Sequence, residues 1–418
     1  MTWSVVVTTL QLKLTTVSVR KWPRKNDAES IKRRQEALEL NGAVTAIDLE
    51  PFVRAQEMLT GAAVIPVSVV GPIELELGEY ELREPHGEVA ETGRARDSVF
   101  VPLAHTEGGL SASLHRGARA VAESGGFRTY VLADRITRAS CFVCDSAGDA
   151  IALARWIEGE LPAMRSWLAE QDDPSLSKFA RLREVKTHVV GSMCHVLWRW
   201  TTGDAVGANM MTRNSYVLNM GYVMGRAPVT PERSILEANM GGDKKPSFEY
   251  FQSGHGKTVL AEATLTGDAV RRVLRTKLDD LAELAWAGTH GAVASGMQSV
   301  AFTPASAIAA VFAATGQDLG MVGTSSMAHG AARRVEGGLQ VSIRLPGLEV
   351  ATIGGGTTLP YARRWLELLG CAGSGKVYRF AQLVAAATLA LEISASAAMA
   401  TAGSAEFFRA HHERGGLR

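Results

Sequence analysis

Residues 380–400 are almost wholly apolar, and this segment restricts the folds open to the chain because it must be removed from water. Its length is close to what a membrane-spanning helix needs. Four polar residues interrupt it, namely Gln382, Glu392, Ser394 and Ser396. Since such groups are costly in a bilayer, the segment is predicted to be a helix buried in a large protein core, and no membrane partner is expected.

Length and composition permit such a core. The 418 residues suffice for roughly two to three domains. Hydrophobic residues make up 46% of the chain and aromatic residues only 6%, so the core must be built mainly from Ala, Val, Leu and Gly. The 44 Lys and Arg residues nearly balance the 43 Asp and Glu residues. The chain therefore lacks the excess positive charge that attracts the phosphate backbone of a nucleic acid. Nucleic acid is therefore not an expected partner.

The cysteines are too few and too scattered for a disulfide framework in a chain this long. Cys141 and Cys144 form half of a zinc-binding pattern, but no second Cys or His pair lies at metal-ligand spacing, so no metal is predicted. Polar residues break up the first twenty positions before they reach signal-peptide length. A reducing, cytoplasmic location is the resulting expectation. The cysteines are Cys141, Cys144, Cys194 and Cys371.

The middle of the chain alternates β-branched and amphipathic segments and is predicted to form a small α+β domain. Outside this block, the polar, Gly-containing stretch 84–98 is predicted to be an exposed loop. A long amphipathic helix is predicted to begin at Asp268 as its N-cap. The elements predicted for the middle block are strands at 129–144 and 186–201 and helices at 149–171 and 208–224.

Three short polar stretches contain residues that could carry chemistry, and each also has an ordinary structural explanation. Asp243-Lys244-Lys245 could be a solvated turn, or Lys244 could polarise a carbonyl oxygen while Asp243 keeps it charged. Glu107, before a predicted helix, could interact with the helix dipole or act as a general acid. Asp318 could cap a helix or act in catalysis. Taken singly, the structural explanations are favoured.

Glycine-rich stretches can indicate a nucleotide-binding site, and the chain has three of them. Residues 354–357 and 373–376 fit neither the dinucleotide-binding fingerprint nor the phosphate-binding loop. Residues 203–210 are more informative, because small residues at the start of a helix let the backbone approach a pyrophosphate at the positive helix end. Asp204 is the predicted N-cap of that helix.

Taken together and in order, several stretches resemble the hydroxymethylglutaryl-CoA reductase family. The combination is far more specific than any one stretch. The resemblance runs from about residue 57 to the tail, leaves the first fifty residues unmatched and is closer to the class with a short C-terminal tail. The matching stretches are 103–110, 203–210, 243–246, 316–318, 353–357 and a histidine near the C-terminus.

The resemblance implies an α+β fold in which a large substrate-binding and dimerisation domain carries an inserted, small ferredoxin-like domain for the nicotinamide cofactor. It also implies a homo-oligomer, a dimer or higher. The expected boundaries are 1–50 for an N-terminal segment, 51–139 with 235–400 for the large domain, 140–234 for the small NADP-binding domain, and 401–418 for a C-terminal catalytic tail.

The family reduces a CoA thioester to an alcohol with two hydrides, and the resemblance implies four catalytic residues here. Lys244 would stabilise the oxyanion, Glu107 would donate protons to the carbonyl oxygen, and Asp318 would tune both through hydrogen bonds. His411, preferred over His412, would protonate the leaving thiolate.

NADPH is the cofactor that the resemblance implies. Ser177 and Lys178 match the family segment whose hydroxyl and basic residue hold the 2′-phosphate, with Lys where Arg is usual. The other expected cofactor-binding residues are Asp204, Val206, Gly207, Ala208, Asn209, Met210, Gly355 and Gly356.

The acyl-binding region departs from the family pattern. Trp286 replaces a lysine that would pair with the free carboxylate of the substrate, Ser306 replaces an asparagine, and Glu237 replaces a serine. Burying a carboxylate without its cation is costly, so these changes disfavour hydroxymethylglutaryl-CoA itself. The positions that do match substrate-binding positions are Arg138 and Lys245, with Asp243 beside Lys244, and Arg116 and Arg119 for CoA phosphates.

The leading interpretation is an NADPH-dependent reductase acting on an acyl-CoA or carrier-protein thioester that need not be hydroxymethylglutaryl. One alternative is an ordinary hydroxymethylglutaryl-CoA reductase that makes mevalonate. Another is a catalytically inactive, oligomeric binding protein on the same fold.

Overall fold

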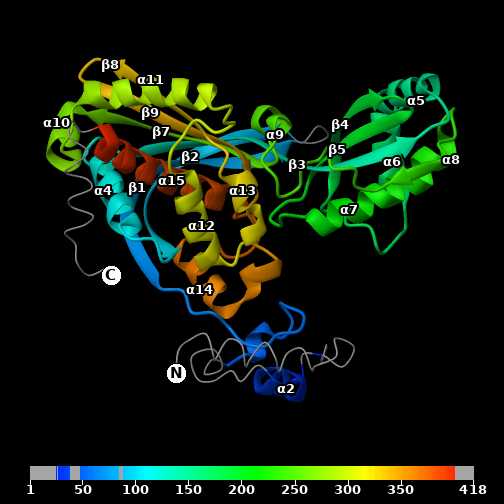
Figure 1. Ribbon diagram of the computed structural model, residues 1–418, viewed down its shortest axis with the longest axis horizontal. Helices are drawn as coiled ribbons and strands as arrows, with labels where there is room; N and C mark the ends of the chain where they lie inside the picture. Colours follow the sequence, from blue (N-terminus) through cyan, green and yellow to red (C-terminus); the bar gives the residue numbers. More distant parts are fainter. Residues whose placement is uncertain (1–24, 26, 38–47, 84–87, 401–418) are drawn as a thin grey trace, which may run out of the picture.

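The computed structural model describes residues 25, 27–37, 48–83 and 88–400 of the chain. Figure 1 shows a large body, in which helices surround a long sheet, and a smaller lobe that the chain enters and leaves in its middle third. Two separate clusters of buried hydrophobic residues match these two parts, one in the body and one in the small lobe. The fold is α+β, as the sequence predicted.

Helix α15 (Val377–Ala400) is the predicted apolar segment, and it lies in the core of the body. By length and composition it could cross a membrane, but most of it is buried inside the protein. It packs on α4 (Leu110–Ala122) so closely that a Cβ on Gly117 would lie 1.8 Å from the carbonyl oxygen of Ala390. Only glycine fits at that crossing.

Three of the four polar residues that interrupt α15 have a hydrogen bond in the described structure, namely Gln382, Glu392 and Ser394. The Gln382 amide accepts from the backbone N–H of Gly78 at 2.8 Å and donates to its carbonyl at 2.9 Å. The Glu392 carboxylate accepts from the N–H groups of Phe302 and Thr303. Ser394 accepts from Arg116 at 2.9 Å. These contacts explain how a protein core accommodates the polar groups that argued against a membrane span.

The strands of the described residues form one connected, nine-stranded arrangement. In the body the strand order is β2-β1-β3-β7-β9-β8, mostly antiparallel, and the long strand β3 continues into the small lobe. The strands of the body are β1 (Val67–Arg83), β2 (Glu88–Ala104), β3 (Phe127–Val143), β7 (Gly256–Thr266), β8 (His329–Val335) and β9 (Gly338–Leu348).

The small lobe has a ferredoxin-like arrangement. Strand β3 pairs antiparallel with both β5 and β6, and β4 pairs with β5, which gives the sheet order β6-β3-β5-β4 with helices after β3 and after β5. Its elements are α5 (Ala147–Gly159), α6 (Leu161–Glu170), β4 (Arg181–Val190), β5 (Met193–Thr201), α7 (Ala208–Val217), the π-helix η3 (Leu218–Val223), α8 (Met224–Arg226) and β6 (Arg233–Ile235).

Two local predictions were wrong. The stretch expected as an exposed loop at 84–98 belongs largely to β2, whose polar residues pair with β1 along its whole length. The helix expected from Asp268 instead begins with Thr266 as its N-cap and is interrupted at Arg275, which has a φ of 58°, before α11 starts at Leu278. At β2, pairing with a neighbouring strand overrode the local pattern.

The remaining helices of the described residues lie on the faces and ends of the body, except the first two in chain order, which lie below it in Figure 1. They are α2 (Ala28–Ala37), η2 (Glu50–Phe52), α9 (Phe248–Ser253), α10 (Gly267–Ala269), η4 (Val270–Leu274), α11 (Leu278–Ala294), α12 (Pro304–Thr315), η5 (Leu319–Met321), α13 (Val322–Ser325), η6 (Gly355–Thr358) and α14 (Pro360–Leu368).

Candidate active site

Lys244 and Asp318 meet as an ion pair. The Lys244 ammonium lies 2.8 Å from a carboxylate oxygen of Asp318, and both side chains are about half exposed. The hydrogen bond that Lys244 donates to Asp318 is the main reason that the pKa of Lys244 is raised above its ordinary value. Asp318 also caps η5 by accepting from the Gly320 N–H at 2.9 Å. The pair therefore presents a charged ammonium held in place by a capped carboxylate.

The backbone at Lys244 is in the left-handed region, with a φ of 58°, which is uncommon for a residue with a side chain. A turn hydrogen bond from the Lys245 N–H to the Gly242 carbonyl, at 2.7 Å, closes the loop around it. The loop lies between β6 and α9, next to η5. Such strain persists where surrounding structure fixes it, and it is common at active sites.

Predicted substrate-binding residues gather beside this loop. Arg138, on β3 and 8% exposed, lies 2.8 Å from Glu237 and 3.5 Å from Asp243. Lys245 donates to Asn239 at 2.8 Å. The structure thus brings Arg138, Glu237, Asp243 and Lys245 together with Lys244, and the negative charge of Glu237 is balanced by Arg138.

Three other predicted residues lie elsewhere in the chain. Glu107 is exposed before α4, and among the described residues it makes no hydrogen bond or ion pair. Trp286 is 67% exposed on α11, where its ring meets His290 edge-on at 4.7 Å. Ser306 is half-buried in the first turn of α12. Within one copy, Glu107 does not join the Lys244–Asp318 pair.

The start of α7 suits an anionic ligand, but not as the sequence predicted. Its N-cap is Gly207, with a φ of 87°, where a Cβ would lie 2.2 Å from the Thr202 side chain. The prediction that Asp204 caps this helix is wrong. The Asp204 carboxylate instead accepts from the backbone N–H groups of Gly375, Lys376 and Val377, at the start of α15. The Asp204 carboxylate is therefore already hydrogen-bonded to the protein backbone.

The remaining predicted cofactor residues of this helix follow Gly207 directly. Ala208 and Asn209 open α7, and Thr212 donates to the Ala208 carbonyl one turn later. Val206 packs partly against the cores of both lobes. Met210 contacts Ser177 through its sulfur at 2.9 Å. These residues form a glycine-led helix start at the junction of the two lobes.

A pocket of the small lobe contains Ser177 and Lys178. Three arginines that the sequence analysis did not single out, Arg165, Arg181 and Arg183, line the same pocket. The basic residue Arg181, four positions after Ser177, was the available sequence signal. A hydroxyl with several cations suits a phosphate group.

Gly355 and Gly356 lie in η6 and touch the segment that carries Asp318. A Cβ on Gly316 would lie 2.3 Å from the Gly356 carbonyl oxygen, so the two glycines allow this approach. Arg116 is bound to Ser394, and Arg119 pairs with Glu123 at 2.9 Å on the surface. His411 lies outside the described residues.

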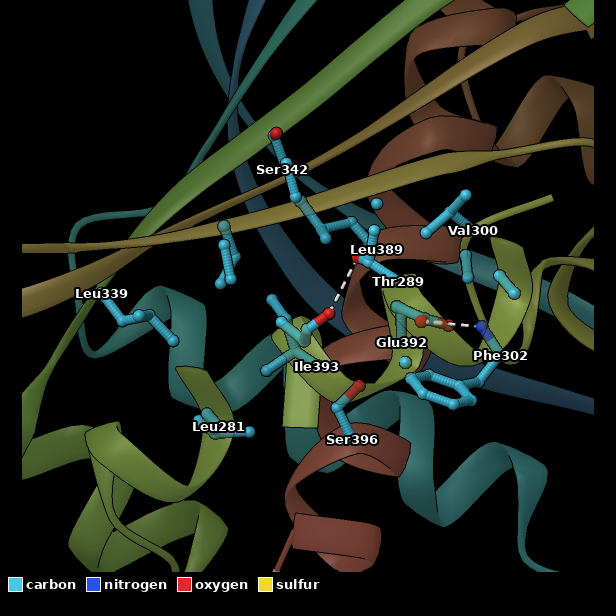
Figure 2. Close-up of a pocket in the computed structure, with 18 of the residues that line it drawn as sticks. Leu281, Thr289, Val300, Phe302, Leu339, Ser342, Leu389, Glu392, Ile393 and Ser396 are labelled. Carbon is cyan, nitrogen blue, oxygen red and sulfur yellow. Dashed lines mark hydrogen bonds between the residues drawn. The ribbon is translucent and has the colours of Figure 1, made fainter. Parts of the chain in front are cut away.

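A largely apolar pocket lies under α11, against α15 and strands β8 and β9 (Figure 2). Figure 2 shows Glu392 at its edge, held by the Phe302 N–H. Ala285, which precedes Trp286, is among its lining residues, whereas Glu107, Lys244 and Asp318 are not. The pocket is distinct from the Lys244 loop.

The comparisons with known proteins agree with these observations. The family model described as hydroxymethylglutaryl-coenzyme A reductase matches residues 24–415, so the match begins earlier than the predicted start near residue 57. The 3-hydroxy-3-methylglutaryl-coenzyme A reductase of Aeropyrum pernix is 35% identical over 90% of this chain and 86% of its own length. The enzyme of the same name from Pyrococcus horikoshii is 35% identical over 82% and 80%.

Solved structures show the same fold. The class II 3-hydroxy-3-methylglutaryl-CoA reductase from Streptococcus pneumoniae, in a structure bound to NADPH, superposes with a TM-score of 0.64 over 96% of this chain and 98% of that chain, at 17% identity. The family model, the archaeal relatives and this common architecture together show that the chain belongs to the hydroxymethylglutaryl-coenzyme A reductase family.

Proposed function

We propose that this protein reduces 3-hydroxy-3-methylglutaryl-CoA to mevalonate with NADPH. The observation that carries the proposal is the Lys244–Asp318 pair at 2.8 Å, in a family whose archaeal members carry that enzyme name. A lysine held charged beside a substrate carbonyl stabilises the negative charge that develops on oxygen when hydride arrives. Two hydrides and two protons convert the thioester to the alcohol and free thiol.

The neighbourhood of Lys244 supports this substrate over the one that the sequence favoured. The sequence predicted that Glu237 disfavours an acidic acyl group, but Arg138 lies 2.8 Å from Glu237 and balances its charge. Lys245 stands next to Lys244 on the exposed side of the loop and offers a cation. The Lys245 ammonium would therefore be available to pair with the free carboxylate of the substrate at this loop.

The position of Glu107 supports an oligomer. We infer that a second copy of the chain brings Glu107 to Lys244, because Glu107 contacts neither Lys244 nor Asp318 within the described part of one copy. His411 would protonate the leaving thiolate from the tail, 401–418. Both roles rest on the family resemblance, and a cytoplasmic location likewise stays a prediction.

We assign NADPH binding to the small lobe, residues 140–234. When bound, NADPH supplies the hydride. The Gly207-led start of α7 would face its pyrophosphate, and Ser177 with Lys178 and the neighbouring arginines would hold the 2′-phosphate. Two features of these residues suit NADPH. The helix begins at a glycine, Gly207, the residue type that fits beside Thr202, and the pocket around Ser177 is lined by basic side chains.

A neutral acyl thioester is the second candidate substrate. Trp286 stands where the family has a substrate-pairing lysine, and an apolar pocket lies directly under its helix (Figure 2). On this alternative the acyl chain would be apolar and would lack the free carboxylate. Trp286→Lys would then raise kcat/KM for hydroxymethylglutaryl-CoA relative to neutral thioesters.

The test measures NADPH oxidation with hydroxymethylglutaryl-CoA and with a panel of neutral acyl-CoA thioesters, and it identifies the products. Selective conversion of hydroxymethylglutaryl-CoA to mevalonate, with two NADPH consumed per thiol released, is expected. Lys244→Ala should lower kcat by about a hundredfold or more, whereas the exposed surface variant Lys277→Ala should match the wild type. Equal and measurable rates for Lys244→Ala and wild type would show that Lys244 is not catalytic, and background rates of the wild type with every thioester would favour a non-catalytic binding protein.

A further inference from the structure

Behind the Lys244 loop, three buried polar atoms face one another. A carboxylate oxygen of Asp243, the imidazole of His255 and a carboxylate oxygen of Glu349 all lie within 4.8 Å of each other. The His255 Nε2 and Glu349 Oε2 atoms are 3.2 Å apart. This cluster adjoins the proposed active site but contains neither Lys244 nor Asp318.

The cluster has unsatisfied polar groups. His255 and Glu349 have side chains with 0% exposure, and His255 Nε2, Glu349 Oε2 and Asp243 Oδ1 are buried without a hydrogen-bond partner among the described residues. Leaving such groups unpaired in a protein interior is costly. A proton on His255 Nε2 can satisfy the imidazole and Glu349, but it leaves Asp243 Oδ1 without a partner.

The three side chains are themselves held by other groups. The Nδ1 atom of His255 lies 2.8 Å from the Thr137 hydroxyl, and the ring stacks on Tyr250 at 4.0 Å. The Thr324 hydroxyl donates to the other oxygen of Glu349. Hydrogen bonds on the far side of ligand atoms orient metal-binding histidines and carboxylates in this way.

The local charges favour a divalent cation. Four carboxylates surround this region, those of Asp243, Glu349, Glu237 and Asp318. Only two cations are paired with them, Arg138 with Glu237 and Asp243, and Lys244 with Asp318. These four carboxylates carry two more negative charges than Arg138 and Lys244 balance, and a divalent ion bound at the cluster would offset that excess.

We propose that Asp243, His255 and Glu349 bind one divalent cation of the zinc class. An imidazole nitrogen and two carboxylate oxygens form a donor set that Zn²⁺ accepts at bonds of about 2.0–2.2 Å, with a fourth position left for water. Ligand atoms in a tetrahedral site lie about 3.4 Å apart. The three ligand atoms here lie within 4.8 Å of one another, so the most widely separated pair must approach by at most about 1.4 Å.

The ligands come from three separate segments, which gives the ion a structural role. Asp243 lies on the Lys244 loop, His255 directly precedes β7, and Glu349 directly follows β9. Strands β7 and β9 are paired at Lys257 and Leu348, so the ion would tie the loop to two adjoining strand ends. The sequence predicted no metal because these three positions share no metal-binding spacing.

The test is the metal content of the full-length protein, purified without chelators and dialysed against metal-free buffer. About one equivalent of a divalent transition metal is expected by mass spectrometry. His255→Gln and Glu349→Gln should each lose it, while His115→Gln, an exposed histidine on α4, should keep it. Adding Co²⁺ to metal-stripped wild type should give the visible absorption of a tetrahedral His–carboxylate site.

Several outcomes would overturn the proposal. Metal-free wild type that gains neither Co²⁺ absorption nor thermal stability with Zn²⁺ would mean that a shared proton or a water molecule occupies the cluster. Metal retained equally in His255→Gln and Glu349→Gln would place it elsewhere. If those variants fail to fold, the Co²⁺ titration of wild type decides, and Glu349→Asp, which keeps a ligand oxygen, should bind Co²⁺ more weakly than wild type.

Discussion

The Lys244 ammonium lies 2.8 Å from the Asp318 carboxylate, although the two residues belong to a strained loop and to the cap of a separate short helix. The raised pKa of Lys244, caused first by that hydrogen bond, keeps the ammonium charged through neutral and mildly alkaline pH. The pair therefore presents a fixed positive charge that could stabilise negative charge developing on a substrate oxygen.

Replacing Asp318 with Asn should lower the pKa of Lys244 toward its ordinary value, because the largest cause that raises it is removed. We expect the alkaline limb of kcat against pH to move to lower pH, with a smaller change in KM. The stability contributed by the pair is present below the unfolded lysine pKa of about 10.5 and is lost as pH rises through the folded value. An unmoved alkaline limb would show that Lys244 does not set it.

Asp204→Ala should destabilise the protein by removing the carboxylate that accepts three backbone N–H groups at the start of α15. We expect the free energy of unfolding to fall by about 2 kcal/mol in urea denaturation. Asp173→Ala, which removes an exposed carboxylate bonded to Ser175, is the matched control and should have little effect. Equal losses in both variants would contradict the capping role.

Asp134 and Lys257 form a buried ion pair at 2.8 Å between β3 and β7, with side chains 2% and 3% exposed. Asp134→Ala leaves the ammonium buried and unpaired by this carboxylate, so a loss of about 3–5 kcal/mol is expected. The double variant Asp134→Leu with Lys257→Met should recover much of that loss in the same denaturation measurement. The pair of Asp97 and Arg379, with side chains 36% and 28% exposed, provides the comparison, and Asp97→Ala should cost about 1 kcal/mol or less.

The four cysteines are free and buried, and burial raises the pKa of Cys194 and of Cys371 to about 12. Since the thiolate is the reactive form, iodoacetamide at pH 8 should label none of them in the native protein. All four should be labelled after denaturation, as counted by mass spectrometry. Rapid labelling of Cys194 in the native state would show that the small-lobe core opens readily.

The sequence by itself predicted the buried apolar helix, the inserted small lobe and the family. Residues 380–400 carry their own signal, because an apolar run with polar interruptions indicates a core helix whatever surrounds it. The stretches around Lys244 and Asp318 were identified from residue type and order. Such local patterns depend on neighbouring residues along the chain, which the sequence contains directly.

Only the tertiary structure decided which distant groups meet. It showed that the Asp204 carboxylate caps the start of α15 instead of α7, and that the polar stretch of β2 is paired in a sheet. It also left Glu107 without a contact to Lys244 within the described part of one copy. It also gathered Asp243, His255 and Glu349 from three segments. These contacts follow from strand pairing and loop closure across long stretches of chain, and local periodicity has no information about either.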